Sequence, residues 1–327
     1  MLERYAFEEG RLVLRDNGDG VLLYIAPTEE ERKHLLKDRG LDPHDLASAL
    51  DPDELGRVEL DGPRATIIIK QPRNYASEDQ LLFTVVSIGL FLEPKRLIVV
   101  APEPLDFFAD KMVHKVANPR DALLKVLYAS IAHFLGHLKV INMISEALEK
   151  RINASMGNKY LLDMFTLEKS LVYYVSGIGS NQMVLEKMHA SAPRLKLTAA
   201  QREILEDILI ENQQCSRQAD IYSNILTGLM DARGSVVNNN LSMLMKKLTV
   251  ISVVFMPMNV LAGMGGMSEF SGWTKAFTPW LSYSVFLVGL CAVGYFTYLV
   301  LKKWDAGASD YELPRGRRKA HGRHESP

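Results

Sequence analysis

The sequence predicts an N-terminal α/β domain, a long helical stalk and two C-terminal transmembrane helices. Three observations support this fold class. Two long apolar runs without a charged side chain lie near the C-terminus, and short strand-like segments fill the first 112 residues. Between these regions, apolar residues recur at the three- and four-residue spacing of helices.

Strand-like stretches dominate the N-terminal region. Residues 11–15 and 21–26 flank an Asn-Gly-Asp-Gly turn at 17–20, which predicts a β-hairpin. A second hairpin is predicted where residues 81–92 and 96–100 flank the turn Glu-Pro-Lys. The β-branched segment ATIIIK predicts another strand between them.

Two short helices are expected in the same region. Thr28 is followed by three glutamates, and a threonine cap with acidic residues in the first turn stabilises a helix N-terminus. Asp42 and Pro43 predict the start of another helix, which we expect to extend to about Leu50.

From Pro119 onward the pattern becomes helical. Residues 121–155 predict one long helix, and residues 161–189 predict a second, which we expect to be loosened at Gly177 and Gly179. A third stretch begins at Thr198 and meets no proline before Pro257. A continuous helix of ~70 residues cannot be buried by its own chain, so it predicts a bundle of several copies.

The two apolar runs are residues 248–267 and 280–301. Each has about the ~20 residues that a helix needs to cross the hydrocarbon layer of a membrane. The alternative is a buried helical hairpin in a soluble core, which the apolar character on all sides of both runs disfavours.

Basic residues predict the orientation of these spans. Lys246 and Lys247 precede the first run, and Lys302 and Lys303 follow the second. Short segments rich in lysine and arginine stay on the cytoplasmic side, so both termini are expected there. The charged N-terminus does not resemble a signal peptide, and we expect a multi-pass protein of the bacterial inner membrane.

These observations divide the chain into seven predicted regions. They are a cytoplasmic α/β domain (1–112), antiparallel long helices (113–197), a stalk helix (198–247), a first transmembrane helix (248–267), a periplasmic loop (268–279), a second transmembrane helix (280–301) and a basic cytoplasmic tail (302–327).

Small and polar residues form a stripe along the end of the long third helix. At steps of three and four residues it contains Asn238, Ser242, Met245, Thr249, Ser252, Met256, Asn259 and Gly263. Polar groups at membrane depth are costly unless they meet protein or water. Taken alone, the stripe favours hydrogen bonding between packed helices over a pore. It lines a pore only if several copies surround an axis.

The segment LMKKLTVISVVFMPMNVLAGMGGMSEF resembles the first transmembrane helix of the CorA family of divalent-cation channels, at FMP, at the following AG and at GM. The segments SIGLFLEPKRLIVV and TEEERKHLLKDRGLDPHDLASALDPDE are similar to the cytoplasmic domain of that family, and TGLMD is similar to its stalk. The resemblance covers nearly the whole chain, and its bacterial CmaX-type branch is the closer guess.

The resemblance implies a CorA-like, funnel-shaped homopentamer that contacts membrane lipid and conducts divalent cations. Its implied pore and filter residues are Ser242, Leu248, Met256, Asn259, Gly263, Gly266, Met267 and Ser268. The helical stripe selects Thr249 where the family implies Leu248, and we follow the family because bundled helices supercoil. Mg²⁺ is the expected ion, with Zn²⁺, Co²⁺ or Ni²⁺ as alternatives.

The resemblance also implies a regulatory cation between subunits. Asp207 corresponds to an acidic position of the stalk, with Glu206 and Glu211 near it. Without the resemblance, these carboxylates fit the solvated face of a long helix. We expect no tightly bound cofactor, and a divalent cation as both substrate and candidate regulator.

One departure from the family concerns the outer mouth. The family signature is Gly-Met-Asn, whereas this chain has Gly266, Met267 and Ser268. A serine hydroxyl reaches less far into a pore than an asparagine amide. Glu269 is a candidate substitute charged ring, or a solvated loop carboxylate. The alternative function is therefore a non-conducting or regulatory membrane scaffold that has lost the filter.

The remaining motifs add little evidence about function. His133 and His137 have the i, i+4 spacing of a metal clamp, but no third ligand is evident, and a packing or surface role is favoured. The basic tail predicts contact with anionic lipid rather than nucleic acid. The two cysteines form no framework, which fits a reducing compartment. No motif of an enzyme is found.

Overall fold

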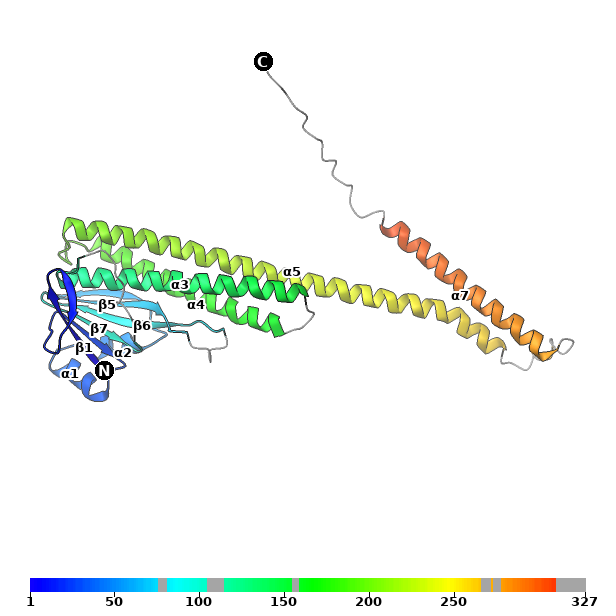
Figure 1. Cartoon of the computed structure of the whole chain (residues 1–327), viewed down its shortest axis with the longest axis horizontal. Coiled ribbons are helices and arrows are strands. Elements are labelled where there is room, and N and C mark those ends of the chain that lie inside the picture. The colour runs from blue at the N-terminus through cyan, green and yellow to red at the C-terminus, as the bar shows by residue number, and fades with distance from the viewer. Residues whose placement is uncertain (76–80, 105–114, 155–158, 266–271, 273–277, 310–327) are drawn as a thin grey trace, which may run out of the picture. The chain divides into compact units, whose positions relative to one another are not determined.

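The computed structural model describes residues 1–75, 81–104, 115–154, 159–265, 272 and 278–309 (Figure 1). The chain forms two compact units, Met1–Ala232 and Arg233–Pro327. We describe each unit by itself.

The first unit contains a seven-stranded sheet in the part of the chain that the structure describes. Its order is β2-β1-β3-β7-β6-β5-β4, and only the β3–β7 pair is parallel among the described pairs. The strands are β1 (Leu2–Glu8), β2 (Arg11–Leu14), β3 (Val21–Ile25), β4 (Arg57–Asp61), β5 (Arg64–Pro72), β6 (Val85–Leu92) and β7 (Leu97–Ala101).

The predicted hairpin between residues 11–15 and 21–26 is wrong. β1 lies between these two strands and pairs with both. Its tight turn to β2 uses Glu9 and Gly10, both with positive φ, which matches the twist of a two-residue hairpin. The segment that contains Gly18 crosses β1 instead, since a Cβ at Gly18 would lie 2.7 Å from the Tyr5 carbonyl carbon.

The second predicted hairpin is confirmed. β6 and β7 are antiparallel with Leu92 opposite Leu97, and the Glu93 N–H donates to the Arg96 carbonyl at 2.9 Å. The segment ATIIIK lies in β5 and is almost entirely buried, as its position between β4 and β6 requires.

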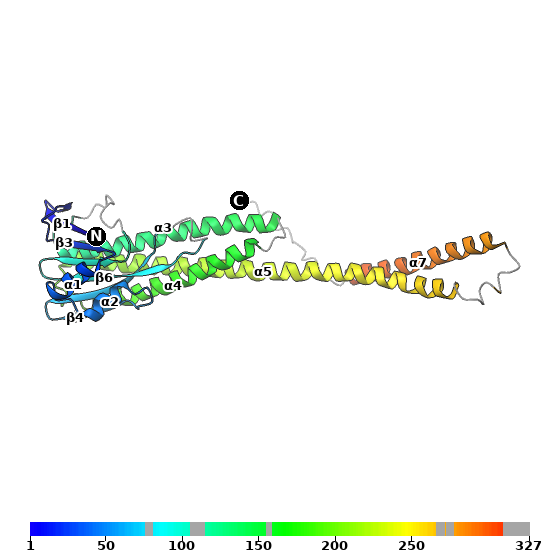
Figure 2. The same cartoon turned by 90° about the horizontal axis from the view of Figure 1, so that it is seen from below.

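The two faces of the sheet pack against different helices. Ile67 and Ile69 of β5 belong to the larger core with the long helices, whereas Ile68 belongs to a second core. The second core contains α1 (Glu29–Lys37) and α2 (Pro43–Leu50), on the face shown nearest the viewer in Figure 2. The predicted cap of α1 is confirmed, because Thr28 and Glu31 form a capping box.

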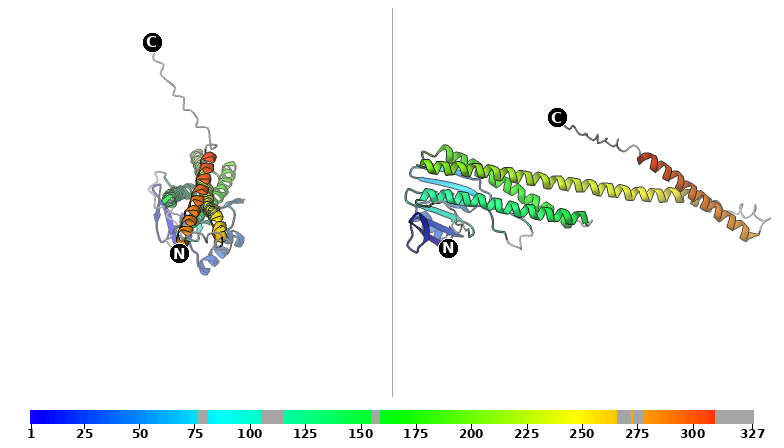
Figure 3. Two further views of the ribbon diagram at one scale, coloured as in Figure 1. Left: turned by 90° about the vertical axis from the view of Figure 1, so that its right-hand side faces the viewer. Right: turned by 45° about the horizontal axis from the view of Figure 1, so that its top comes forward.

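The long helices follow the predicted pattern closely. They are α3 (Pro119–Ala154), α4 (Lys159–Ala190), α5 (Ala199–Gly265) and α7 (Pro279–Ser309). In the first unit, α3 and α4 cover the sheet, and the first half of α5 packs on these two helices (Figures 1 and 3). Thr198 caps α5 through the Gln201 N–H, and α5 is unbroken over 67 residues.

The expected loosening of α4 at its glycines is wrong, because α4 is continuous. Gly177 instead permits close packing. A Cβ there would lie 3.3 Å from Val85 Cγ1 and 3.5 Å from Lys70 Cβ, so the glycine lets the helix approach β5 and β6. The position of Gly179 is open.

Polar side chains of α4 hold the sheet in place. Asn181 accepts from the Lys70 backbone N–H and donates to the Lys70 carbonyl, both at 2.7 Å. Ser170 accepts from the Phe83 N–H at 2.9 Å, and Ser180 accepts from the Gly56 N–H at 2.7 Å. These bonds satisfy backbone groups that burial would otherwise leave unpaired.

Candidate pore lining and carboxylate pocket

Three described helices are long and apolar enough to cross a membrane. They are Pro119–Arg151, Ala199–Met264 and Trp280–Lys303. In the first, 44% of the most apolar window is buried, because α3 packs on the sheet. The corresponding windows of α5 and α7 are 0% and 6% buried. The ends of α5 and α7 therefore carry apolar surface that the chain itself leaves uncovered.

Within the second unit, α7 covers one face of α5. Gly294 of α7 is buried, and a Cβ there would lie 2.7 Å from Met258 Sδ. The half-buried positions of this part of α5 share that face: Val250, Val254, Pro257, Met258 and Leu261. A glycine in an apolar helix was the one sign of this contact that could be seen before the structure.

The predicted pore residues that the structure describes lie off this covered face. Ser242, Leu248, Met256, Asn259 and Gly263 are all exposed, and Met256 is 66% exposed. Packing of α7 on α5 within one chain therefore does not use the predicted stripe. The remaining filter residues are Gly266, Met267 and Ser268, and these, with Glu269, lie outside the described residues.

The polar groups of the stripe differ in how they are satisfied. Thr249 donates to the Met245 carbonyl at 2.9 Å, and Ser252 donates to the Leu248 carbonyl at 3.0 Å. These bonds satisfy the hydrogen-bonding donors of both hydroxyls within their own helix. The Asn259 side chain makes no hydrogen bond within the described part of the chain. In hydrocarbon an amide without a partner is costly, so Asn259 requires water or another chain.

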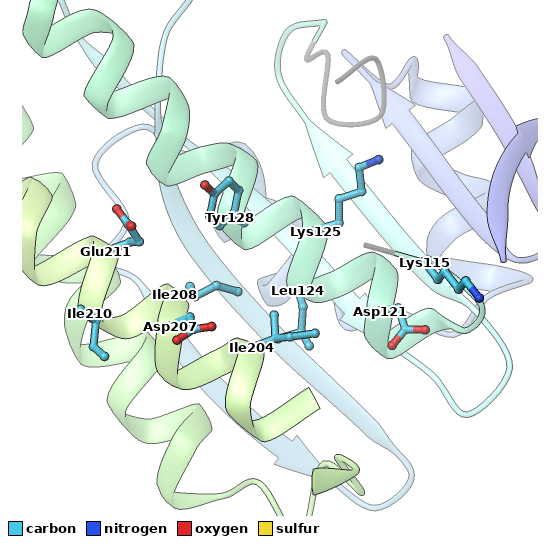
Figure 4. Close-up of a pocket in the computed structure, with 10 residues that line it drawn as sticks. All are labelled: Lys115, Asp121, Leu124, Lys125, Tyr128, Ile204, Asp207, Ile208, Ile210 and Glu211. Atoms are coloured by element: carbon cyan, nitrogen blue, oxygen red, sulfur yellow. The ribbon is translucent and has the colours of Figure 1, made fainter. Parts of the chain in front are cut away.

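A cavity of about 270 Å³ lies between α3 and α5 in the first unit, and Figure 4 shows its lining. Asp207 and Glu211 of α5 line it from one side, one helical turn apart. Glu206 is exposed and does not line it. The structure thus brings together two of the three predicted regulatory carboxylates and separates the third.

The charges of this cavity are partly balanced. Lys115 and Lys125 also line it. The third carboxylate, Asp121, accepts from Gln201 Nε2 at 2.6 Å and from Asn118 Nδ2 at 2.7 Å. No group of three His, Cys, Asp or Glu able to hold a metal is found among the described residues. One chain therefore places the carboxylates of Asp207 and Glu211 at this cavity, without a complete set of metal ligands among the described residues.

His133 and His137 form a half-buried, hydrogen-bonded pair rather than an open clamp. Their Nε2 atoms are 3.1 Å apart, and His137 Nδ1 lies 2.6 Å from the Tyr174 hydroxyl. Gln71 Nε2 lies 3.3 Å from His133 Nδ1. Burial lowers the pKa of His133, and burial together with His133 lowers the pKa of His137 to about 4. A neutral pair in this hydrogen-bonded chain agrees with the predicted packing role.

The model of the family described as CorA-like Mg²⁺ transporter protein matches residues 22–303. The chain belongs to this family. The CorA match begins within β3, covers the cavity and the exposed stripe, and ends near the end of α7, so it includes both units.

Two curated relatives support this assignment to CorA. The cobalt/magnesium transport protein CorA of Methanocaldococcus jannaschii is 26% identical over 278 residues, which cover 82% of this chain and 83% of that protein. The cobalt/magnesium transport protein CorA of Thermotoga maritima is 26% identical over 184 residues, which cover 56% of this chain and 52% of that protein.

Solved structures share the CorA fold. The complete CorA magnesium transporter of Methanocaldococcus jannaschii has a TM-score of 0.74 at 21% identity, covering 90% of this chain and 96% of its own. The full-length CmaX protein has a TM-score of 0.68 at 16% identity, covering 91% and 96%. The predicted fold, an α/β domain with a long helix and apolar C-terminal helices, is thereby confirmed.

Proposed function

We propose that the chain assembles as a homopentamer in the bacterial inner membrane and conducts divalent cations passively. Mg²⁺ is the first candidate, because two relatives are named as cobalt/magnesium transport proteins. Co²⁺, Zn²⁺ and Ni²⁺ are the alternatives. The observation that carries the proposal is Asn259, an amide without a partner in the described part of the chain, on the face of an apolar helix that α7 leaves uncovered.

Five copies around an axis give Asn259 the partner that it requires. A ring of five amide oxygens replaces or binds the water shell of a hydrated cation. Mg²⁺ prefers oxygen ligands and gives up its water reluctantly, so an amide collar suits it better than imidazole or thiolate would. Met256, one turn away, forms an apolar constriction that closes by dewetting.

Passive movement is sufficient in this arrangement. A membrane potential contributes about 2.3 kcal/mol per elementary charge for each ~100 mV, so a doubly charged cation is driven inward without a coupled reaction. The basic residues beside both spans support a cytoplasmic location of the two termini. In this orientation anionic lipid attracts Lys246, Lys247, Lys302 and Lys303.

The carboxylates of the cavity supply regulation in this proposal. Asp207 and Glu211 of one copy, completed by ligands from a neighbour or by water, hold a divalent cation between subunits. A cation that binds the closed arrangement more tightly shifts the population toward it, so a high cytoplasmic concentration shuts the channel.

The direct test is divalent-cation uptake by the full-length protein in liposomes, with Asn259→Leu as the variant. We expect about tenfold or more loss of Mg²⁺ flux, because the water shell loses its amide partners. Ser252→Ala is the matched control, since that hydroxyl is closed on its own helix, and its flux should stay within about twofold. Equal Mg²⁺ flux in Asn259→Leu and the wild type would refute the proposal that Asn259 lines a cation-conducting pore.

A second candidate function rests on Ser268. If the outer filter has been lost with the asparagine, the chain is a non-conducting scaffold of the same fold. Ser268→Asn separates the two functions in the same uptake assay. Flux that appears only in this variant supports the scaffold, and flux in the wild type supports the channel.

A further inference from the structure

A second cavity, of about 230 Å³, lies in the first unit where four segments meet. These are the β4–β5 turn, the β6–β7 turn, the start of α3 and the connection from α4 to α5. Its charged lining residues are Arg64, Glu93, Arg120, Arg194 and Lys196. Four of the five are cations, which distinguishes this cavity from the carboxylate pocket, the cavity that Asp207 and Glu211 line.

The acidic residue of the cavity is already neutralised. Glu93 forms ion pairs with Arg64 at 2.7 Å and with Arg96 at 3.2 Å. Arg64 also donates to the backbone carbonyls of Arg39 and Gly40. Because two arginines already neutralise Glu93, this carboxylate does not balance the charges of the other cations that line the cavity.

The other three cations have no acidic partner within ion-pair distance among the described residues. Arg120 Nε donates to the Leu195 carbonyl at 2.8 Å, and Arg194 Nη2 donates to the Leu60 carbonyl at 3.2 Å. Neutral carbonyls orient these guanidinium groups without cancelling their charge. Lys196 is exposed and makes no side-chain hydrogen bond within the described ranges. The cavity thus combines three uncompensated positive charges.

The backbone at Lys196 is strained. Its φ is 56°, in the left-handed region that lysine rarely adopts. The conformation is held because Leu195 and Leu197, on either side, are 4% and 5% exposed. Their burial leaves the Lys196 side chain at the cavity. Strain of this kind in a ligand-binding segment is maintained by the surrounding packing.

We propose that this cavity binds a phosphoryl group, from inorganic phosphate or from a nucleotide. Guanidinium groups match the paired oxygens of phosphate, and a lysine adds a point charge. The cavity volume is below the ~300–1,000 Å³ of sites for drug-sized molecules, which favours a small anion or the terminal group of a larger one. This anion site is separate from the proposed cation pathway and adds a second ligand to the first unit.

The test is calorimetric titration of the full-length protein in detergent with inorganic phosphate, pyrophosphate and magnesium-free ATP at constant ionic strength. We expect saturable binding of at least one, and about tenfold or more weaker binding in the Arg194→Gln/Lys196→Asn double variant. Asparagine tolerates the left-handed conformation, so the second substitution removes charge without adding strain. Lys196→Asn alone gives the same comparison if the double variant is unstable.

Arg202→Gln is the matched control, because this exposed arginine of α5 does not line the cavity, and its affinity should stay within about twofold. Tighter binding of phosphate than of ATP identifies the free anion, and the reverse identifies a nucleotide. No saturable binding of any of the three probes up to about 10 mM would overturn the proposal. Equal loss in the control would overturn it as well. Neither result bears on cation flux, so the channel proposal is tested independently.

Discussion

Gly294 of α7 lies directly against Met258 of α5: a Cβ at Gly294 would lie 2.7 Å from the methionine sulfur, so the methionine side chain would have to move. Small residues at such contacts let membrane helices approach closely, and van der Waals packing then holds them together. The contact fixes which face of α5 is covered within one chain.

Gly294→Val should therefore weaken the pairing of α7 with α5. We expect a destabilisation of about 1 kcal/mol, at the low end for overpacking because the flexible Met258 side chain can move, and thermal unfolding in detergent measures it. Gly289→Val is the control, since nothing lies within 4 Å of that position. Met258→Ala should restore part of the lost stability in the Gly294→Val background, and an absence of coupling between the two positions would argue against the contact.

The half-buried pair of His133 and His137 predicts a loss of stability in acid. The pKa of His137 is about 4 in the folded protein, against an ordinary value of 6.5. Between these two pH values the unfolded chain therefore binds a proton at this residue, whereas the folded chain does not. Stability should fall as the pH drops from about 6.5 to about 4, by about 2 kcal/mol after allowance for partial exposure. Thermal unfolding of the wild type at about pH 7.5 and about pH 5 measures it.

The same experiment on two variants assigns the effect. His137→Gln should lose part of the acid sensitivity, because its side chain does not titrate, whereas His189→Gln changes an exposed histidine and should keep it. An unchanged pH dependence in His137→Gln would remove the pair as its cause.

Asn181 should be a major determinant of stability in the first unit. In Asn181→Ala the Lys70 N–H loses its partner, and the Lys70 carbonyl keeps only the bond from Ser130. A buried unpaired group costs about 1–3 kcal/mol, which thermal or chemical unfolding detects. Lys187→Ala, an exposed change on the same helix, should lie within about 0.5 kcal/mol of the wild type.

The carboxylate pocket predicts protection by divalent cations. Mg²⁺ should slow limited proteolysis of the wild type, and the Asp207→Asn/Glu211→Gln double variant should lose most of that protection. Glu206→Gln is a matched control from the same helix, because Glu206 does not line the pocket. If Glu206→Gln and the double variant behave alike, the pocket is not the site of protection.

Patterns within single elements predicted much of this fold. Thr28, Thr198 and the Glu-Pro-Lys turn each specify a local structure through caps and turn chemistry, and the structure has the corresponding helix starts and hairpin. The order of the first strands was missed because residues 2–8 were not predicted as a strand, although the two-residue turn at Glu9 and Gly10 joins β1 to β2. Nothing in the turn at 17–20 indicates that β1 lies between β2 and β3.

The candidate sites divide in the same way. The family resemblance singled out Asp207, with Glu206 and Glu211 near it, but it did not say which of the two glutamates shares a face with Asp207. The unbroken helix α5 puts Asp207 and Glu211 one turn apart at the cavity. The resemblance gave no information on the basic cavity, where Arg120, Arg194 and Arg64 come from three separate segments. Contacts such as Asn181 with Lys70 also depend on tertiary packing, and an asparagine in a helical pattern does not reveal its partner.

The polar side chains of the stripe differ in hydrogen bonding, and this difference affects which face of α5 can point toward lipid. Thr249 and Ser252 are satisfied by their own helix, so pointing them at acyl chains carries little penalty. Of these three polar side chains of the described helix, Asn259 is the one whose exposure to acyl chains is costly. The packing of α7 and the amide of Asn259 therefore constrain the rotation of α5 in the bilayer together, and a chain without the amide would keep only the first of these two constraints.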